Sequence, residues 1–567
     1  AIAIDIESVA FTNGTLSYQD QVAGTRAVVE ALNLTTGNIV AEKSFPVELS
    51  LVVKQFADAS NTPSLTAAVN LQSQARFNLE TLTVWLNELT TTTDVSGSAF
   101  AKPLSISLGG DLVASPAQLV ISKLQLAVAN LKADGNLDIS NFAAPIISGD
   151  IAIGSFALNE LMAALGQPAI ETTDPSVLKN IAAELTLDGT ANLISIPKLA
   201  VRLDETRFTG NLAYALDSGA IIANIAGDKI DADRYLPPAS GEQTAASQPP
   251  ASSGEQPLYS KEDVVPVELI KSLNLDTTFT LNSLRINKLD MQDVDIAVTV
   301  EKGVLNAKRL NLDMYQGQLR NSVVVNTNKS PVALSINKSV KGVQIGDMLK
   351  AMADTDMLTG AINSSAKLTA RGTSVHDIVH SLNGSTSTTM DKGELKGIDM
   401  AYTVCQGLNT VGSLGINTQD VDRSTPFADL RANTKIVNGV VTNPDLKASL
   451  DAMALTGNGQ VNLPNEDFNY KLGLTIESNL FNKSCSIPDF IEGVKLPVIC
   501  KAGFFDEPVD MCRPDLSGFR NIFKAQTEAK VNAEIKKQRE KAKAALEEKV
   551  TEKLGDDAKS LLKGLFR

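Results

Sequence analysis

Hydrophobic and polar residues alternate with a period of two along most of the chain. Leu124, Leu126 and Val128 share one side of an extended strand, and the alternation resumes after an Ala-Asp-Gly sequence that we interpret as a turn. Segments 184–216 and 278–320 repeat the pattern, with turn pairs such as Asp-Gly, Lys-Gly, Asn-Gly and Gln-Gly between the runs. Such pairs supply the positive φ that tight hairpins need. The pattern predicts a long antiparallel meander with one apolar face and one polar face.

Only short stretches interrupt the alternation with a helical pattern. They are residues 157–167, 345–360 and 374–384, and each leads back into predicted strands. The first contains Gly166, which suits a helix C-cap. These helices are too few to cover the apolar face of the meander.

Changes in composition divide the chain into four parts. Residues 237–260 are rich in Pro, Ser, Ala, Gly and Gln without apolar periodicity, so we expect a disordered linker there. The linker separates a β-rich N-terminal groove segment, 1–236, from a second β-rich segment, 261–518. The last part, 519–567, is predicted to be a charged helix.

The terminal helix carries a set of apolar residues near helical spacing: Val531, Ile535, Leu546, Val550 and Leu554. We expect a solvated helix that packs by this one stripe. A coiled coil with a partner is the alternative.

A long sheet with one apolar face must cover that face, because contact of apolar surface with water costs about 25 cal/mol per Å². The sheet can curl into a trough filled by acyl chains, close into a barrel, or pack as a two-sheet sandwich. Aromatic residues make up only 5% of the chain, and small aliphatic side chains leave room for lipid tails. We therefore expect a mainly β fold: an elongated, curled antiparallel meander with a trough-like apolar groove, a few short helices and a long C-terminal helix.

Alternation also selects the side chains that would line such a groove. Each of them is equally suited to a packed core. The candidates for lipid contact are Leu124, Leu126, Val128, Leu185, Leu187, Leu199, Val201, Leu203, Phe279, Leu281, Ile286, Leu310 and Leu312.

Charge and aromatic content narrow the set of partners. The formal net charge is −14, which argues against nucleic acid, because phosphates need a basic surface. It also argues against electrostatic attachment to anionic lipid headgroups. A single tryptophan, Trp85, leaves few platforms on which bases or sugars could stack.

Four cysteines lie in the last third of the chain: Cys405, Cys485, Cys500 and Cys512. An even number confined to one region favours two disulfides and an oxidising compartment over four buried thiols. We expect Cys500 to pair with Cys512 and Cys405 with Cys485, while two other pairings are open. No Cys-x-x-Cys pair suggests zinc.

One motif suggests catalysis. His376 and His380 lie four residues apart, with Asp377 between them, as in the zinc-binding pattern of metalloproteases. These are the only histidines, and no further residue is indicated as a third ligand. Neither a Gly-x-Ser-x-Gly elbow nor a phosphate-binding loop is present. We expect no enzyme activity, no catalytic residues, no metal and no cofactor, with a metal hydrolase as the alternative.

The chain begins at Ala1 in what reads as a strand, without Met. We therefore expect that a segment upstream is missing, and a signal or anchor there is open. No run of 18 or more apolar residues predicts a membrane span.

Three stretches together resemble the AsmA family: residues 13–39, "KIDADRYLP" at 229–237, and 368–400. In the last, "SLNG" is read as the end of a short helix and "DKGELKGID" as a hairpin. The resemblance continues through 426–449 and 455–463.

The resemblance implies a Gram-negative envelope protein with an inner-membrane anchor at its N-terminus and a periplasmic body. Such bodies are similar to bridge-like lipid-transfer proteins, whose folded-over sheets enclose an apolar groove. The expected function is phospholipid movement from the inner to the outer membrane, in support of outer-membrane integrity. Phospholipid acyl chains are the expected partners, together with an outer-membrane or periplasmic protein. The alternative is a scaffold or outer-membrane assembly factor that binds proteins through sheet edges.

Overall fold

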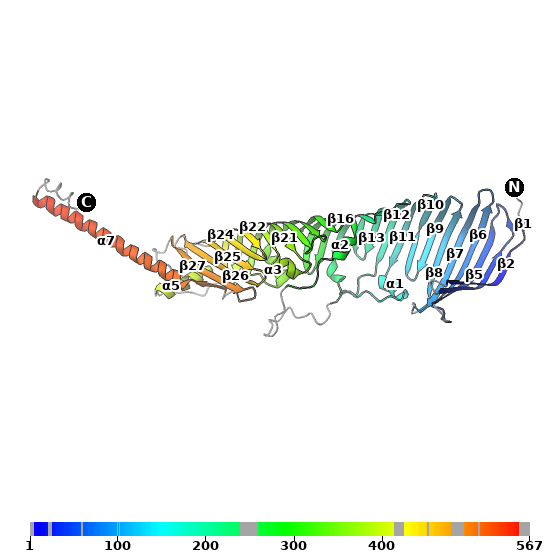
Figure 1. Cartoon of the computed structure of the whole chain (residues 1–567), viewed down its shortest axis with the longest axis horizontal. Coiled ribbons are helices and arrows are strands. Elements are labelled where there is room, and N and C mark those ends of the chain that lie inside the picture. The colour runs from blue at the N-terminus through cyan, green and yellow to red at the C-terminus, as the bar shows by residue number, and fades with distance from the viewer. Residues whose placement is uncertain are drawn as a thin grey trace. The chain divides into compact units, whose positions relative to one another are not determined.

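The computed structural model describes residues 5–20, 25–57, 61–98, 100, 102–238, 259–412, 424–450, 453–477, 493–507 and 511–554. Within these ranges the protein consists mainly of β-strands (Figure 1). Strands β1 (Asp5–Ile6) and β4 (Ile39–Val40) pair with each other, and the 26 other described strands form one sheet. Its end strands, β2 (Ala10–Asp20) and β28 (Cys512–Pro514), each pair with one described neighbour, so the sheet is open. The predicted mainly β, antiparallel meander is confirmed.

Contacts between residues divide the chain into two compact units. The division falls within β20 (Ala333–Gln344), whereas composition placed a boundary at 237–260. Most of that linker, 239–258, lies outside the described residues. Unit 1 comprises residues 1–337 and 372–375, and unit 2 comprises residues 338–371 and 376–567.

Unit 1 holds a ladder of strands in which each pairs with the next along the chain, β1 and β4 excepted. Its helical elements are α1 (Leu158–Ala164), η1 (Ala232–Arg234) and α2 (Val267–Ser272). Helix α1 matches the helix predicted at 157–167. The remaining strands of the ladder are β3 (Thr25–Thr36), β5 (Phe45–Ala57), β6 (Leu65–Asn78), β7 (Thr83–Gly97), β8 (Leu104–Ala114), β9 (Gln118–Val128), β10 (Leu131–Ser140), β11 (Ile146–Phe156), β12 (Ile181–Gly189), β13 (Leu193–Leu203), β14 (Thr206–Ala215), β15 (Ala220–Asp231), β16 (Asn274–Ile286), β17 (Leu289–Glu301), β18 (Val304–Met314) and β19 (Gly317–Asn326).

Tight turns with positive φ connect strands of unit 1. One of the predicted turns is confirmed and another was placed wrongly. Lys302 (φ 49°) and Gly303 (φ 74°) form the β17–β18 turn, as the Lys-Gly pair predicts. The Ala-Asp-Gly sequence ending at Gly135 lies inside β10, and the chain turns earlier, at Ala129 (φ 52°). Glycine is required at position 135 because a Cβ on this residue would lie 2.2 Å from the carbonyl oxygen of Asp150 on the neighbouring strand.

The pairing of β15 with β16 departs from the predicted antiparallel order. Strands β15 and β16 run parallel, with Ala220 beside Asn274 and Asp231 beside Arg285. A parallel pair needs a connection that returns along the length of a strand. The connection 232–273 is long enough to do so, and we call this pairing the parallel step.

The end of β15 leads into Asp233, Arg234 and Tyr235, which we call the DRY motif. The carboxylate of Asp233 accepts hydrogen bonds from the backbone N–H groups of Asn287 (2.5 Å) and Lys288 (2.9 Å). These two residues form the β16–β17 turn. The motif therefore connects the strands on the two sides of the parallel step.

The other two residues of the DRY motif bind the loops that lead into β12 and β14. Arg234 donates hydrogen bonds to Asp174 (2.7 Å) and Glu205 (3.0 Å). The hydroxyl of Tyr235 donates to Asp204 Oδ2 at 2.9 Å. Three loops of unit 1 are thus joined through one short segment.

Asp204 is the buried centre of these contacts, with 6% of its surface exposed. It also accepts hydrogen bonds from the backbone N–H groups of Leu178 (2.8 Å), Lys179 (3.1 Å) and Asn180 (3.1 Å). Burial alone would raise the pKa of Asp204, but the hydrogen bonds together outweigh it and hold the pKa below its usual value.

Asp204→Asn is expected to lower the free energy of unfolding by about 2–4 kcal/mol, because the amide loses the charge that four donors surround. Urea unfolding measures the loss, and exchange of the amides at 178–180 localises it. Asp188→Asn, at an exposed position on β12, is the control and should change stability by less than about 0.5 kcal/mol. Because the folded pKa of Asp204 is depressed, its stabilisation is present above about pH 4 and lost as the pH falls below that. An acid transition identical in the wild type and Asp204→Asn would contradict this assignment.

In unit 2 the sheet is covered on one side by helices. Besides β28 and the second half of β20, the described elements of this unit are α3 (Ile345–Ala353), β21 (Leu358–Arg371), α4 (Val375–His380), β22 (Asn383–Lys396), α5 (Met400–Gly412), β23 (Ser424–Val437), β24 (Val440–Leu450), β25 (Met453–Asn462), β26 (Asp467–Ile476), β27 (Lys495–Gly503) and α7 (Leu516–Leu554). Val404 and Leu408 on α5 are fully buried, and Phe519 at the start of α7 is 1% exposed. Together with the facing strands they form a packed core.

Two sequence expectations for unit 2 were wrong. Residues 391–399, "DKGELKGID", do not form a hairpin, because β22 continues through them to Lys396. Helix α5 was not predicted and lies directly after this strand. On α7, Val531 and Ile535 are 53% and 45% exposed, so they do not pack the helix as a stripe. The other stripe side chains, Leu546, Val550 and Leu554, lie outside the described part.

A disulfide joins the last two strands of the sheet. Cys500 on β27 and Cys512 on β28 lie directly opposite each other, with Cα atoms 4.0 Å apart. The expected pairing of Cys500 with Cys512 is confirmed. Cys405 is also disulfide-bonded. Its expected partner, Cys485, lies outside the described residues, so that pairing stays a prediction.

Within the described residues, no helix is both long enough and apolar enough to cross a membrane.

Candidate functional site

The predicted groove residues all lie on strands of unit 1. Leu124, Leu126 and Val128 are on β9; Leu185 and Leu187 are on β12; Leu199, Val201 and Leu203 are on β13; Phe279, Leu281 and Ile286 are on β16; Leu310 and Leu312 are on β18.

Strand pairing brings five of the predicted groove residues, one each from β9, β12, β13, β16 and β18, into a single row across the sheet. Directly paired residues point to the same side of a sheet. The row, which we call the central row, has no polar side chain across ten strands. Its members, each paired with the next, are Leu124, Gly135, Ile151, Leu185, Leu199, Gly210, Ile225, Phe279, Ile296 and Leu310.

A second row runs beside the central row on the same side, two residues away on each shared strand. It extends from β2 to β17, and Thr91 is its only polar member. The row consists of Phe11, Leu34, Leu49, Leu71, Thr91, Leu108, Leu126, Ala133, Ile153, Ala183, Val201, Phe208, Gly227, Leu281 and Val294.

Ile286 is in neither row. It pairs with Leu289 at the end of β16, beyond a position where the pair between residues 282 and 293 is missing and Asp293 has φ 49°. Counting by two from Leu281 does not carry across such an irregularity. The assignment of Ile286 to the groove therefore stays a prediction.

Between β9 and β15 the apolar side of the sheet is open. The central-row residues on these strands are half-buried, although their neighbours in the row shield them on both flanks. Helix α1, which follows β11, buries none of its residues. We call the apolar side of β9–β15 the open face.

The open face ends at β16, where packing becomes tight. Leu281, Val294 and Val300 are 2%, 4% and 2% exposed, and Ile270 on the neighbouring helix α2 is 3% exposed. Helix α2 contacts β17 and β18. Leu281 therefore belongs to a packed core and not to an exposed groove.

The family model for AsmA matches residues 1–446. The chain belongs to the AsmA family. None of the curated proteins matches the sequence. Membership of this family fits an envelope-associated protein. The matched residues include every strand of the open face and the whole DRY motif.

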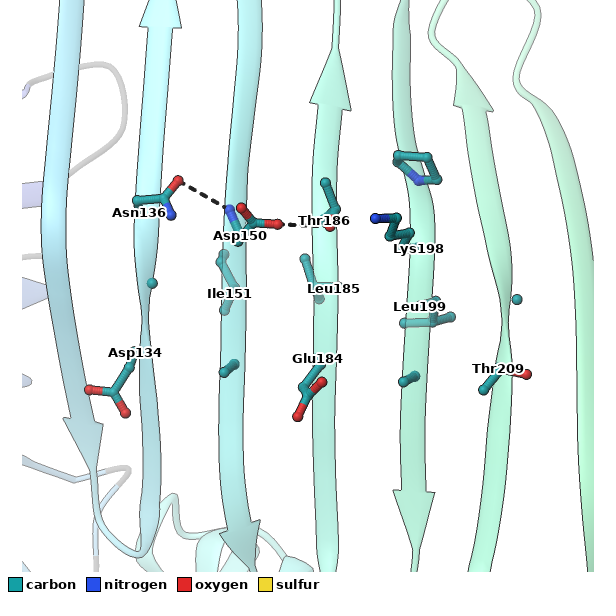
Figure 2. Close-up of a pocket in the computed structure, with 15 residues that line it drawn as sticks. Asp134, Asn136, Asp150, Ile151, Glu184, Leu185, Thr186, Lys198, Leu199 and Thr209 are labelled. Atoms are coloured by element: carbon teal, nitrogen blue, oxygen red, sulfur yellow. Dashed lines mark hydrogen bonds between the residues drawn. The ribbon is translucent and has the colours of Figure 1, made fainter.

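A depression of about 680 Å³ crosses β10–β14 of this AsmA-family protein, and its lining includes five members of the central row together with polar residues of the same strands. The central-row members are Gly135, Ile151, Leu185, Leu199 and Gly210. Figure 2 shows Asp150 between Asn136 and Thr186, with Thr186 Oγ1 donating to Asp150 Oδ1 at 2.8 Å. These side chains alternate with Ile151 and Leu185 of the central row and so point away from the open face. The depression therefore includes part of the central row, while Asp150 and Thr186 lie on the opposite side of the same strands.

The two histidines of this AsmA-family protein lie on α4. Their rings stack with centroids 3.9 Å apart, and His380 Nδ1 lies 2.8 Å from the carbonyl oxygen of His376. The carboxylate of Asp377 is 3.4 Å from His376 Nδ1. Among the described residues, no group of three or more His, Cys, Asp or Glu side chains is placed to hold a metal.

Sequence reasoning missed the glycines of the central row. We interpreted Gly135 as a turn residue, and Gly210 was not considered. Both are within strands, where a Cβ would collide with the backbone of the next strand: at Gly210 it would lie 2.0 Å from the carbonyl oxygen of Asn224. A glycine between alternating apolar residues is the signal that marks such close approach.

Proposed function

We propose that this protein is a non-catalytic lipid-transfer protein of the periplasm, supporting phospholipid movement from the inner to the outer membrane. Acyl chains would lie along the open face while their headgroups stay in water. The observation that supports this is the pair of apolar rows, unbroken from β9 to β15 and not packed against a described helix.

Hydrocarbon is the chemistry that such a surface favours. Each Å² of apolar surface left in water costs about 25 cal/mol, so a bound acyl chain stabilises both itself and the sheet. The central row offers aliphatic groups and glycine backbone with no hydrogen-bonding side chain, so it would not select a polar ligand. A disulfide at the β27–β28 pair fits the oxidising periplasm. Attachment to the inner membrane by a segment upstream of Ala1 is part of this proposal.

Delipidated protein is expected to take up labelled phospholipid, and protein purified without detergent is expected to carry phospholipid in native mass spectrometry. More than one lipid per chain is expected, because the face is continuous over seven strands, β9 to β15. Absence of lipid in both experiments would refute the proposal.

A scaffold function is the second candidate, and strand β2 favours it. This edge strand pairs only with β3 among the described strands, and Leu16 and Tyr18 on it are 65% and 64% exposed. An unpaired edge can accept a strand from another protein. Stoichiometric copurification of an envelope protein with lipid-free chain would favour this function over lipid transfer.

A further inference from the structure

Helix α7 is attached to unit 2 by its first turns. Phe519 is 1% exposed, and Ile522 and Phe523 pack against the same core. Helix α7 starts beside α5 and β27 (Figure 1). From Thr527 to Ala545 every residue is exposed. This helix also lies beyond the residues that match the AsmA family.

The charge of the chain is strongly segregated. Residues 512–567 carry 14 Lys and Arg against 9 Asp and Glu, a net charge of +5, whereas the rest of the chain carries −19. Within α7, the eight residues from Lys536 to Lys543 include five cations and one acid, Glu540. The net charge of −14 for the whole chain is therefore the sum of an acidic body and a basic C-terminal part.

Distance separates this charge from the core of unit 2 to which α7 is attached. A helix rises 1.5 Å per residue, so Lys536 lies about 25 Å along the axis from Phe519. Charges in water are screened over about 8 Å at physiological ionic strength. A surface that approaches the middle of α7 therefore meets mainly the charges of the helix.

The basic stretch is accompanied by exposed apolar side chains. Val531, Ile535 and Ala542 are spaced by four and seven residues, which places them on one side of the helix. Val531 and Ile535 are 53% and 45% exposed. Lys536, Lys537 and the other cations flank this side or oppose it. The basic stretch thus combines clustered cations with two exposed aliphatic side chains, and polybasic segments are attracted to anionic lipid surfaces.

We propose that α7 docks on a membrane surface rich in anionic phospholipid. The cations face the phosphates, while Val531 and Ile535 enter the headgroup region. The inference does not need lipid on the open face, so it stands or falls separately from the proposed function. The net charge of the whole chain argued against attachment to anionic lipid headgroups, and this proposal reverses that expectation for α7 alone.

The test measures binding of the full chain to vesicles of phosphatidylcholine with 30% phosphatidylglycerol, by flotation. Each Lys or Arg near an anionic surface contributes about fivefold to binding. A variant with Lys536→Gln, Lys537→Gln, Arg539→Gln and Lys541→Gln is therefore expected to bind at least about a hundredfold more weakly. Glutamine is a good helix former, and far-UV circular dichroism checks that α7 is kept.

The matched control carries Lys43→Gln, Lys102→Gln, Lys132→Gln and Lys179→Gln, four exposed lysines of unit 1. It has the same change in net charge and should bind as the wild type does. Binding of the wild type should weaken from 50 to 300 mM salt and on pure phosphatidylcholine. Equal binding by the two variants, or equal binding to both vesicle types, would overturn the proposal. Vesicle binding that depends on α7 in a protein that takes up no lipid would refute lipid transfer and leave this inference standing.

Discussion

Leu199→Asp is expected to reduce phospholipid transfer between vesicles by about a thousandfold while leaving the fold intact. An acyl chain that moves along the central row would meet a carboxylate at this position. With a reference pKa of about 3.9, protonating that carboxylate at pH 7 costs about 4 kcal/mol, which sets the size of the effect. Leu199 is half-buried and pairs with Leu185 and Gly210, so no packed core is opened.

The control is the next residue on the same strand. Ala200→Asp introduces the same charge on the polar side of β13, opposite Glu184 and Thr209. Its transfer rate should stay within about twofold of the wild type, since nothing on that side touches the acyl chain. Transfer is measured with a labelled phospholipid in donor vesicles. Equal loss of transfer in both variants, or unfolding of Leu199→Asp, would contradict an open apolar path.

Leu281→Asp is expected to unfold the strands around β16 instead of merely blocking transfer. Leu281 is 2% exposed, and its Cδ1 occupies the space above Gly227, 2.6 Å from where a Cβ would stand. Removing the buried side chain costs about 2 kcal/mol and neutralising the new carboxyl about 4 kcal/mol. The sum is comparable to the whole stability of a domain.

Leu187→Asp is the comparison for this second variant. Leu187 lies on the open face, is half-buried and pairs with Gly149 on β11. Its stability in urea should fall by no more than about 1 kcal/mol, because the carboxylate stays in contact with water. If Leu281→Asp unfolds at the same urea concentration as Leu187→Asp, the packed region does not begin at β16.

Alternation and turn chemistry predicted the strands well because both are local. The Lys302-Gly303 pair forms the expected turn, and the period of two placed Leu124, Leu185 and Leu199 on one side without knowledge of their pairing. The same local rules failed at Gly135, because glycine serves both turns and close strand contacts. They also failed at the parallel step, because the local sequence of β15 or β16 does not determine which strand it pairs with or in which direction.

For the candidate site, the alternation of residues along a strand predicted which side chains share a side of the sheet, but not which of them are buried. Counting by two along β16 selects Phe279 and Leu281, which lie in the two apolar rows, but it does not carry past the interrupted pairing at Asp293 to Ile286. Burial is different, because it depends on what lies above the sheet. Leu185 and Leu281 have the same pattern in sequence, yet only Leu281 is buried.

The parallel step has a consequence for how such a sheet can change in length. Hairpins add or remove strands in twos, because each short turn reverses the chain and cannot reach the far end of a strand. The connection 232–273 already joins opposite ends of β15 and β16. A single strand can therefore be gained or lost beside it without rebuilding any other turn. In evolution, an even-numbered sheet of this kind can become odd-numbered at this junction.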